Sequence, residues 1–148
     1  MTARLAQTDR DLAARLAGAS PLRQRAAAGV AAIYALDATD VSDDTVQAVR
    51  AQLEQGVHDP AQREVLDRIV AELDGIAMSV RDDMEDGNTD YVAYLKEFSR
   101  ARAVSALSYA MDEDPERAAL ESVYEACSAM DDVAPIRSKI EAALLGPS

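Results

Sequence analysis

The chain has one histidine and one cysteine, His58 and Cys127, so the side chains that most often serve as catalytic base and nucleophile occur once each. His58 precedes an Asp-Pro helix start, where an exposed loop residue is expected. Cys127 falls on an apolar helical stripe, which favours a small buried side chain. A single histidine also excludes a histidine-pair metal site. We therefore expect no catalytic residues, no cofactor and no enzymatic activity.

The segment from Asp82 to Asp90 has the carboxylate density of a calcium-binding loop without its full set of ligands. In an EF-hand pattern that starts at Asp82, position three is Met84 and position twelve is Ala93. Position twelve normally supplies a bidentate carboxylate, so the pattern fails at the residue that matters most. We interpret the segment as a junction between two helices and predict no metal site in it.

Two further acidic turns, Asp37 with Asp40 and Asp112 with Glu113 and Asp114, stand at equivalent places in two similar stretches of sequence. In this paired arrangement they resemble the turns of the tellurite-resistance TerB-like domains, small all-helical proteins whose acidic turns are associated with a bound cation. The resemblance covers only residues 37–49 and 112–123, and the glycine that usually follows the first acidic residue is Ala38 or Glu113. It implies an alternative function as a divalent-cation-binding stress-response protein, although helix capping accounts for most of these carboxylates.

Three of the six aromatic residues lie within eight positions, at a spacing that places them on one side of a helix beside the acidic segment. Either these rings fill the core of the second half of the chain, or part of this surface is exposed and anchors a protein partner. For the second interpretation the partner-binding residues are Tyr91, Tyr94, Phe98, Asp82, Asp83, Asp86 and Asp90.

The charge is strongly acidic, with 27 acidic against 15 basic residues and a net charge of −12. Nucleic acid is not expected as a partner, because phosphate binding needs clustered cations. The acidity serves either solubility and overall composition, or electrostatic complementarity to a basic protein. The longest uncharged apolar run, residues 26–36, is too short to cross a membrane, and the single cysteine is typical of a cytoplasmic protein.

Start and stop signals predict an all-α chain of about seven helices and no strand, in a single domain. Residues 3–17 form the N-terminal helix, and capping residues at Ser20, Ser42, Asp59 and Asp114 begin later helices. A compact bundle and a short helical array both remain open. We expect a largely buried core at the following positions: Leu12, Leu16, Val30, Ile33, Val46, Leu53, Leu66, Ile69, Leu73, Val104, Leu107, Leu120, Val123, Ile136 and Ile140.

A repeat with an offset of about 75 residues indicates a possible internal duplication. Residues 25–37 and 100–112 are identical at seven of thirteen positions, including Arg25 with Arg100, Tyr34 with Tyr109 and Asp37 with Asp112. Four of the matches are alanine, which is abundant throughout the chain. The corresponding halves would be residues 20–74 and 88–146.

These observations favour a non-enzymatic, acidic protein-binding module, such as an inhibitor, an immunity-type protein or an adaptor for a basic partner. The cation-binding protein described above is the alternative. An enzyme or a small-molecule pocket ranks third, since carboxylates alone can act as acid and base.

Overall fold

The computed structural model describes residues 3–87 and 91–146, and within these ranges the chain is all-α, as predicted, with no strand. Its elements are α1 (Arg4–Thr8), α2 (Arg10–Ala17), α3 (Pro21–Thr39), α4 (Asp44–Glu54), the 3-10 helix η1 (Pro60–Gln62), α5 (Arg63–Glu85), α6 (Tyr91–Ala110), α7 (Pro115–Ser128) and α8 (Ala134–Leu145).

Capping side chains set the helix starts, and two of the predicted starts are corrected. The predicted N-terminal helix is divided at Asp9, whose φ of −149° breaks the helix and whose carboxylate accepts a hydrogen bond from the Leu12 amide at 3.1 Å. This accounts for eight α-helices in the described residues where about seven were expected. The cap of α4 is Asp43 rather than Ser42, since the Asp43 carboxylate accepts from the Val46 amide at 3.0 Å.

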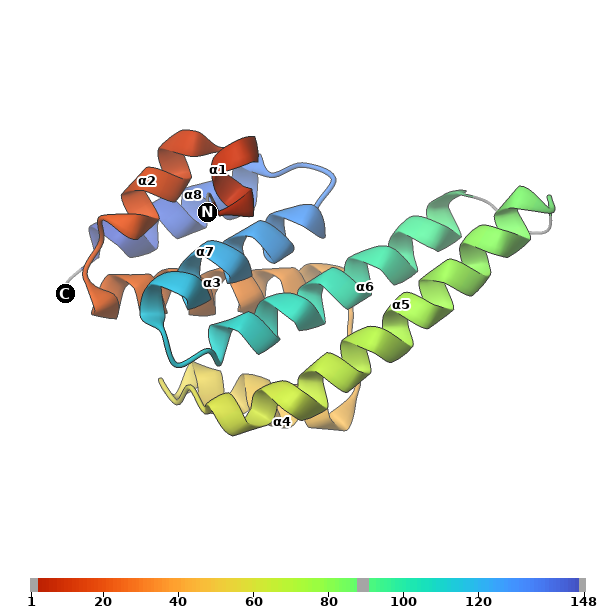
Figure 1. The fold of residues 1–148 in the computed structure, drawn as a ribbon, viewed down its shortest axis with the longest axis horizontal. Coiled ribbons are helices and arrows are strands. Elements are labelled where there is room, and N and C mark those ends of the chain that lie inside the picture. The colour runs from red at the N-terminus through yellow and green to blue at the C-terminus, as the bar shows by residue number, and fades with distance from the viewer. Residues whose placement is uncertain (1–2, 88–90, 147–148) are drawn as a thin grey trace.

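The body of the molecule is built around α3 and α6, which run antiparallel and pack on each other (Figure 1). Helix α7 packs on both of them, α8 packs on α3, and the short helices α1 and α2 pack on α7. Alanines fill the interfaces of α3, α6 and α7, because their small side chains let helices approach closely. The buried Ser122 hydroxyl of α7 lies 3.2 Å from the Ala28 carbonyl of α3 and 2.9 Å from the Ala106 carbonyl of α6. It therefore has hydrogen-bond partners where the three helices meet.

The predicted core positions are all buried or half-buried. The half-buried ones border a groove or lie where few helices cover them: Val30, Ile33, Leu53, Ile69, Leu73 and Leu120.

Helices α5 and α6 extend beyond the body as a two-helix projection (Figure 1). Helix α5 has 23 residues and α7 only 14, which at 1.5 Å per residue is about 35 Å against about 21 Å. Among the described residues, the central hydrophobic core ends at Leu73 in α5 and Ala103 in α6. We call residues 74–87 and 91–100 the arm; its two helices cover each other and little else covers them.

The two matching segments make reciprocal contacts at opposite ends of the α3–α6 pair. The Arg25 guanidinium donates to the carbonyls of Asp112 and Glu113 at 2.6 and 2.8 Å, just past the end of α6. Arg100 donates to the Thr39 carbonyl at 3.4 Å, at the end of α3. This reciprocity is what two related halves would produce, but superposition of residues 20–74 on 88–146 is the direct test, and the duplication stays a prediction.

The carboxylate of Asp112 joins the start of α5 to the end of α6 and the start of α7. It accepts from Arg63 at 2.7 Å, from Arg117 at 2.9 and 3.0 Å and from the Asp114 amide at 2.8 Å, while the residue itself is buried. Burial alone would raise the pKa of this carboxyl, but the hydrogen bonds and charges of Arg117, the Asp114 amide and the charge of Arg63 outweigh it, and the pKa is lowered.

Replacing Asp112 by Asn is expected to lower the free energy of unfolding at neutral pH by about 1.5–3 kcal/mol, the range for hydrogen bonds to a charged group. Because the native pKa is lowered, this stabilisation is present above the ordinary aspartate pKa and disappears as pH falls through the native value. Urea unfolding along an acid pH series should show the difference between wild type and variant shrinking. The matched control is Asp37→Asn at the exposed equivalent position, with an expected cost of about 0–1 kcal/mol; equal costs for both variants would contradict the assignment.

Candidate protein-binding arm

The three aromatic residues singled out in the sequence form one continuous row along the first turns of α6. The ring centroids of Tyr91 and Tyr94 are 6.1 Å apart, and so are those of Tyr94 and Phe98, at interplanar angles of 34° and 33°. These rings do not belong to the central core of the described residues. Tyr91 is 58% exposed, and Tyr94 and Phe98 are half-buried against α5. The rings therefore lie outside the central core, with two of them partly covered, and the interpretation as a partner-binding row stays a prediction.

Two arginines lie over the row of rings, Arg81 from α5 and Arg102 from α6 itself. The Arg81 guanidinium lies 6.0 Å from the Tyr94 ring centroid, and that of Arg102 lies 5.6 Å from the Phe98 centroid. Arg102 also donates to both carboxylate oxygens of Asp74 at 2.8 Å and to Glu125 of α7 at 3.1 Å. The seam between α5 and α6 is thus fixed by charge as well as by packing.

Met78 lies on the same side of the arm as the aromatic row. It is four residues after Asp74 and three before Arg81, a spacing that places the three residues on one side of α5. Its side chain is 56% exposed. We call Met78, Tyr91, Tyr94 and Phe98 the aromatic face. Ile76, two positions from Met78 and 48% exposed, points to the opposite side of α5.

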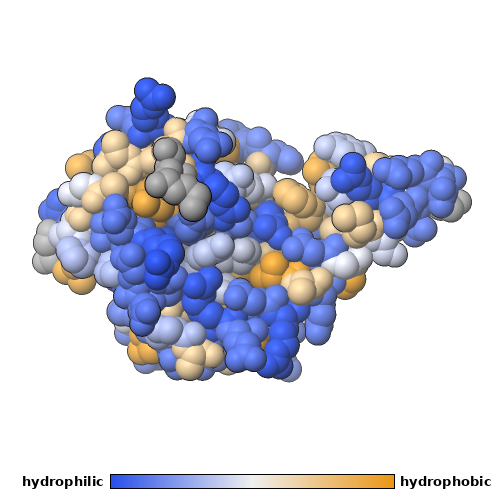
Figure 2. Space-filling view, in the orientation of Figure 1, coloured by the Kyte–Doolittle hydropathy of each residue, from blue (hydrophilic) through white to orange (hydrophobic). Residues whose placement is uncertain are grey.

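The free end of the arm is acidic. Asp82, Asp83 and Asp86 are exposed, and no ion pair joins any of them to another described residue. Figure 2 shows hydrophilic residues gathered at this end and apolar residues nearer the body. The charged residues of the described arm are Asp74, Asp82, Asp83, Glu85, Asp86 and Glu97 against Arg81, Lys96 and Arg100. Asp90, the remaining predicted site residue, lies outside the described residues.

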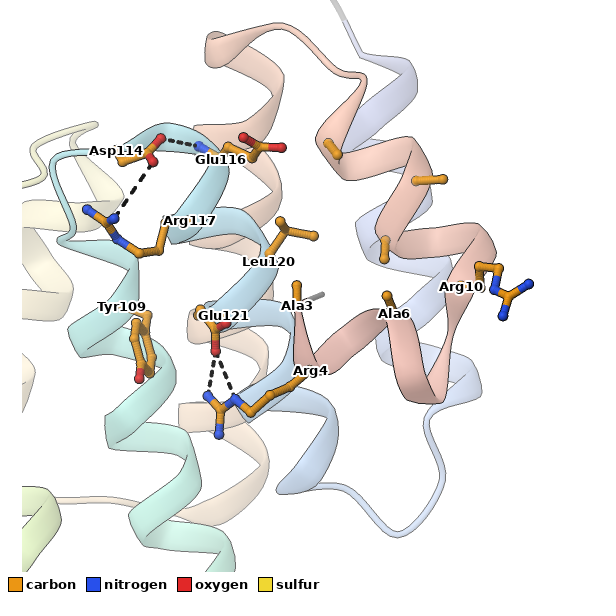
Figure 3. A pocket seen from close by; sticks show the side chains of 13 residues that line it. Ala3, Arg4, Ala6, Arg10, Tyr109, Asp114, Glu116, Arg117, Leu120 and Glu121 are labelled. Carbon is orange, nitrogen blue, oxygen red and sulfur yellow. Dashed lines mark hydrogen bonds and ion pairs between the residues drawn. The ribbon is translucent and has the colours of Figure 1, made fainter. Parts of the chain in front are cut away.

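A separate groove of about 790 Å³ lies between the two N-terminal helices and α7 (Figure 3). Alanines of α1 and α2 and Leu120 of α7 provide its apolar lining. Its charges are mostly engaged with each other, because Arg4 donates to Glu121 and Arg117 pairs with Asp112 and Asp114. The described residues that line the groove include no histidine, cysteine or serine, and its ionisable or hydroxyl groups are arginines, carboxylates and Tyr109.

The remaining candidates for chemistry are the single cysteine and the single histidine, and the structure places them in different surroundings. Burial chiefly, with the nearby charge of Asp9, raises the pKa of Cys127 to about 11, so the group is a neutral thiol rather than a nucleophilic thiolate at neutral pH. His58 is exposed at the edge of the groove between α3 and α4. In the part of the chain that the structure describes, no group of three or more histidine, cysteine, aspartate or glutamate side chains is arranged to hold a metal ion.

The acidic turns of the predicted repeat are bound by arginines. Asp37 accepts from Arg50, and Asp112 accepts from Arg63 and Arg117. Asp114 caps α7 by accepting from the Glu116 amide at 3.1 Å. Each of these carboxylates therefore has a cationic or amide partner in the folded chain.

Sequence reasoning found the aromatic row and the carboxylates but missed Met78 and the projection itself. The available signal was length: the apolar stripes from Val65 to Met84 and from Tyr91 to Met111 are both much longer than the stripe from Leu120 to Met130, which indicates two helices that extend beyond a shorter partner. The roles of the arginines at the seam are not visible in the local sequence, since Arg102 is distant in sequence from Asp74 and Glu125 and pairs with them only in the folded chain.

No protein-family model, curated protein or solved structure matches this chain. No described helix is both long enough and apolar enough to cross a membrane.

Gly75 offers a test of how the arm is packed. It lies inside α5, and a Cβ at this position would meet nothing within 4 Å. Gly75→Ala should therefore raise the free energy of unfolding by about 0.5–1 kcal/mol, through helix propensity alone. Gly87→Ala, at a position with φ of +81° at the end of the same arm, should lower it by about 1 kcal/mol. Urea unfolding measures both, and a destabilising Gly75→Ala would show that this side of α5 is covered in solution.

Proposed function

We propose that this chain is a non-enzymatic, acidic protein-binding module that presents the arm to a basic protein partner. The observation that carries the proposal is the aromatic face, which lies outside the core, is more than half exposed at Met78 and Tyr91, and adjoins carboxylates with no ion-pair partner among the described residues. An inhibitor, an immunity-type protein and an adaptor all fit this mode of action.

The arrangement favours binding over a purely solubilising role for the charge. Solubility requires only scattered surface carboxylates, and carboxylates without an arginine partner among the described residues also occur on the body, for example Asp44, Glu113 and Glu116. What sets the end of the arm apart is that unpaired carboxylates occur there together with exposed apolar side chains: Asp82 lies one helical turn after the exposed Met78 on the same side of α5 and has no ion-pair partner among the described residues. Large amphipathic rings surrounded by charge are typical of interface centres.

Each component has a separate physical role in association. Unpaired carboxylates on a projecting arm attract a basic surface over the Debye length, which raises the rate of encounter. The rings and Met78 act after contact, because burying their surface slows dissociation. Since α6 continues into the core of the body, the rings are held on a rigid element and lose little freedom on binding.

The alternative of a divalent-cation-binding stress-response protein has no structural observation in its favour. Of its expected ligands in the two acidic turns, Asp37 and Asp112 are bound by arginines and Asp114 caps α7, while Asp40 and Glu113 are exposed. It stays a prediction from the sequence.

The proposal is tested on the partner retained by the immobilised protein, with association and dissociation rates measured by surface plasmon resonance. Replacing Asp82, Asp83 and Asp86 together by Asn should lower the association rate roughly tenfold and weaken its salt dependence. Tyr94→Ala should raise the dissociation rate about tenfold or more. Circular dichroism confirms that the variants fold.

The control for charge is the triple variant Asp44→Asn, Glu113→Gln and Glu116→Gln, which removes three exposed carboxylates from the body. It should change the association rate much less than the arm variant does. Equal effects of the two triple variants on the association rate, or an association rate that does not change with salt concentration, would contradict a binding role for the arm.

A further inference from the structure

The seam between α5 and α6 is covered by a third helix in the body and uncovered in the arm. Arg102 marks the boundary, since it binds Asp74 of α5 and Glu125 of α7 at once. Helix α7 ends at Ser128, less than one turn after Glu125. Phe98, one turn of α6 further out, lies against Arg102 and begins the aromatic face. Figure 1 shows α7 ending well short of the free end of the arm.

On the basis of the proposed function, we propose that the partner contributes a basic amphipathic helix, which lies on the aromatic face and continues the line of α7 as the third helix of a local bundle. In the body, α6 packs on α3 and α7 as well as on α5, whereas in the described part of the arm it packs mainly on α5, with Arg100 at its base still reaching the end of α3. A helix is the element whose apolar stripe fits the seam between two antiparallel helices.

The apolar part of this surface matches such a stripe. Met78 and Tyr91 are exposed on either side of the seam, with the half-buried rings of Tyr94 and Phe98 between Tyr91 and the body. The distance from Phe98 to the start of α6 is two turns, so a docked helix of roughly three turns covers the face. Isolated helices of that length are marginal in water, so the partner segment is either part of a folded protein or becomes helical on binding.

The charge of the arm decides which helix fits. Next to the body the charges at the seam are already paired, through Arg102 with Asp74 and Glu125. At the free end Asp82, Asp83 and Asp86 have no ion-pair partner in the described chain. The complementary helix therefore carries Lys or Arg toward the free end and apolar residues toward the body. A second copy of this chain is disfavoured as occupant, because each copy has a net charge of −12.

The test uses a labelled synthetic peptide of about 18 residues, five helical turns, with leucines along one side and lysines beside them. Fluorescence anisotropy with the full-length protein should show binding that weakens as salt rises. Met78→Ala and Tyr91→Ala should each weaken binding about five- to tenfold. The matched control, Ile76→Ala, removes a similarly exposed apolar side chain from the opposite side of α5 and should change the affinity less than about twofold. A peptide with glutamates in place of the lysines should not bind.

Several results would overturn this inference, the first three of them from the peptide titrations. Those three are no binding of the basic peptide, equal binding of the acidic peptide, and an Ile76→Ala effect as large as that of Met78→Ala. Sedimentation that shows dimers abolished by Met78→Ala would also overturn it, since the occupant would then be a second copy. The natural partner separates the two proposals. If its affinity falls when Asp82, Asp83 and Asp86 are replaced but is unchanged by Met78→Ala, and if it does not compete with the peptide, the proposed function stands and the docked helix is rejected. If binding of the natural partner is unchanged both by replacing Asp82, Asp83 and Asp86 and by Met78→Ala, both proposals are rejected.

Discussion

The structure depends on one mismatch between helix ends: α5 and α6 run past the ends of α3 and α7, the helices that cover α6 in the body (Figure 1). Within the body, α6 is covered by α3, α5 and α7, and its alanines allow close packing on all three. Where α7 ends, α6 retains only α5 as a neighbour. Two helices cannot bury all their apolar residues against each other, so Met78 and Tyr91 remain exposed. The candidate binding surface is a direct consequence of this mismatch.

Arginine–carboxylate contacts hold the base of the arm in place. Asp112 ties α5 and α7 to the end of α6, and buried Glu125 receives Arg4 of α1 and Arg102 of α6. A planar guanidinium donates to several acceptors at fixed angles, so one arginine can join two or three helices. Only two lysines occur in the chain, Lys96 and Lys139, against thirteen arginines, and every inter-helix ion pair among the described residues is made by arginine. A firm base keeps the aromatic face at a fixed angle to the body, which lowers the entropic cost of binding.

The class of fold was predictable because helix periodicity and capping are local properties. Ser20, Asp59 and Asp114 cap as the sequence indicates, since each carries a side-chain oxygen next to a proline at the helix start. Asp9 was missed because its neighbours continue the apolar stripe, and nothing local shows that the chain bends there to bring Arg137 of α8 onto its carboxylate.

The candidate site was predictable only in part. The spacing of Tyr91, Tyr94 and Phe98 identifies one side of a helix, but periodicity does not say what covers that side. Tyr91 is exposed because α7 ends before it could cover that ring. The residues of α7 begin more than twenty positions after Tyr91, so the local sequence does not show this. Met78 was overlooked because it stands outside the main apolar stripe of α5, and its neighbours on the aromatic face come from α6.

The most direct measurement is amide hydrogen exchange of the full-length protein with and without the basic peptide. In the free protein, exchange should be faster in residues 74–87 and 91–100 than in α3 and α7, because the arm has the fewest buried contacts. Addition of the peptide should slow exchange around Met78 and Tyr91 and leave the groove between α3 and α4 unchanged. Protection confined to that groove, or no protection in the arm at saturating peptide, would contradict the account.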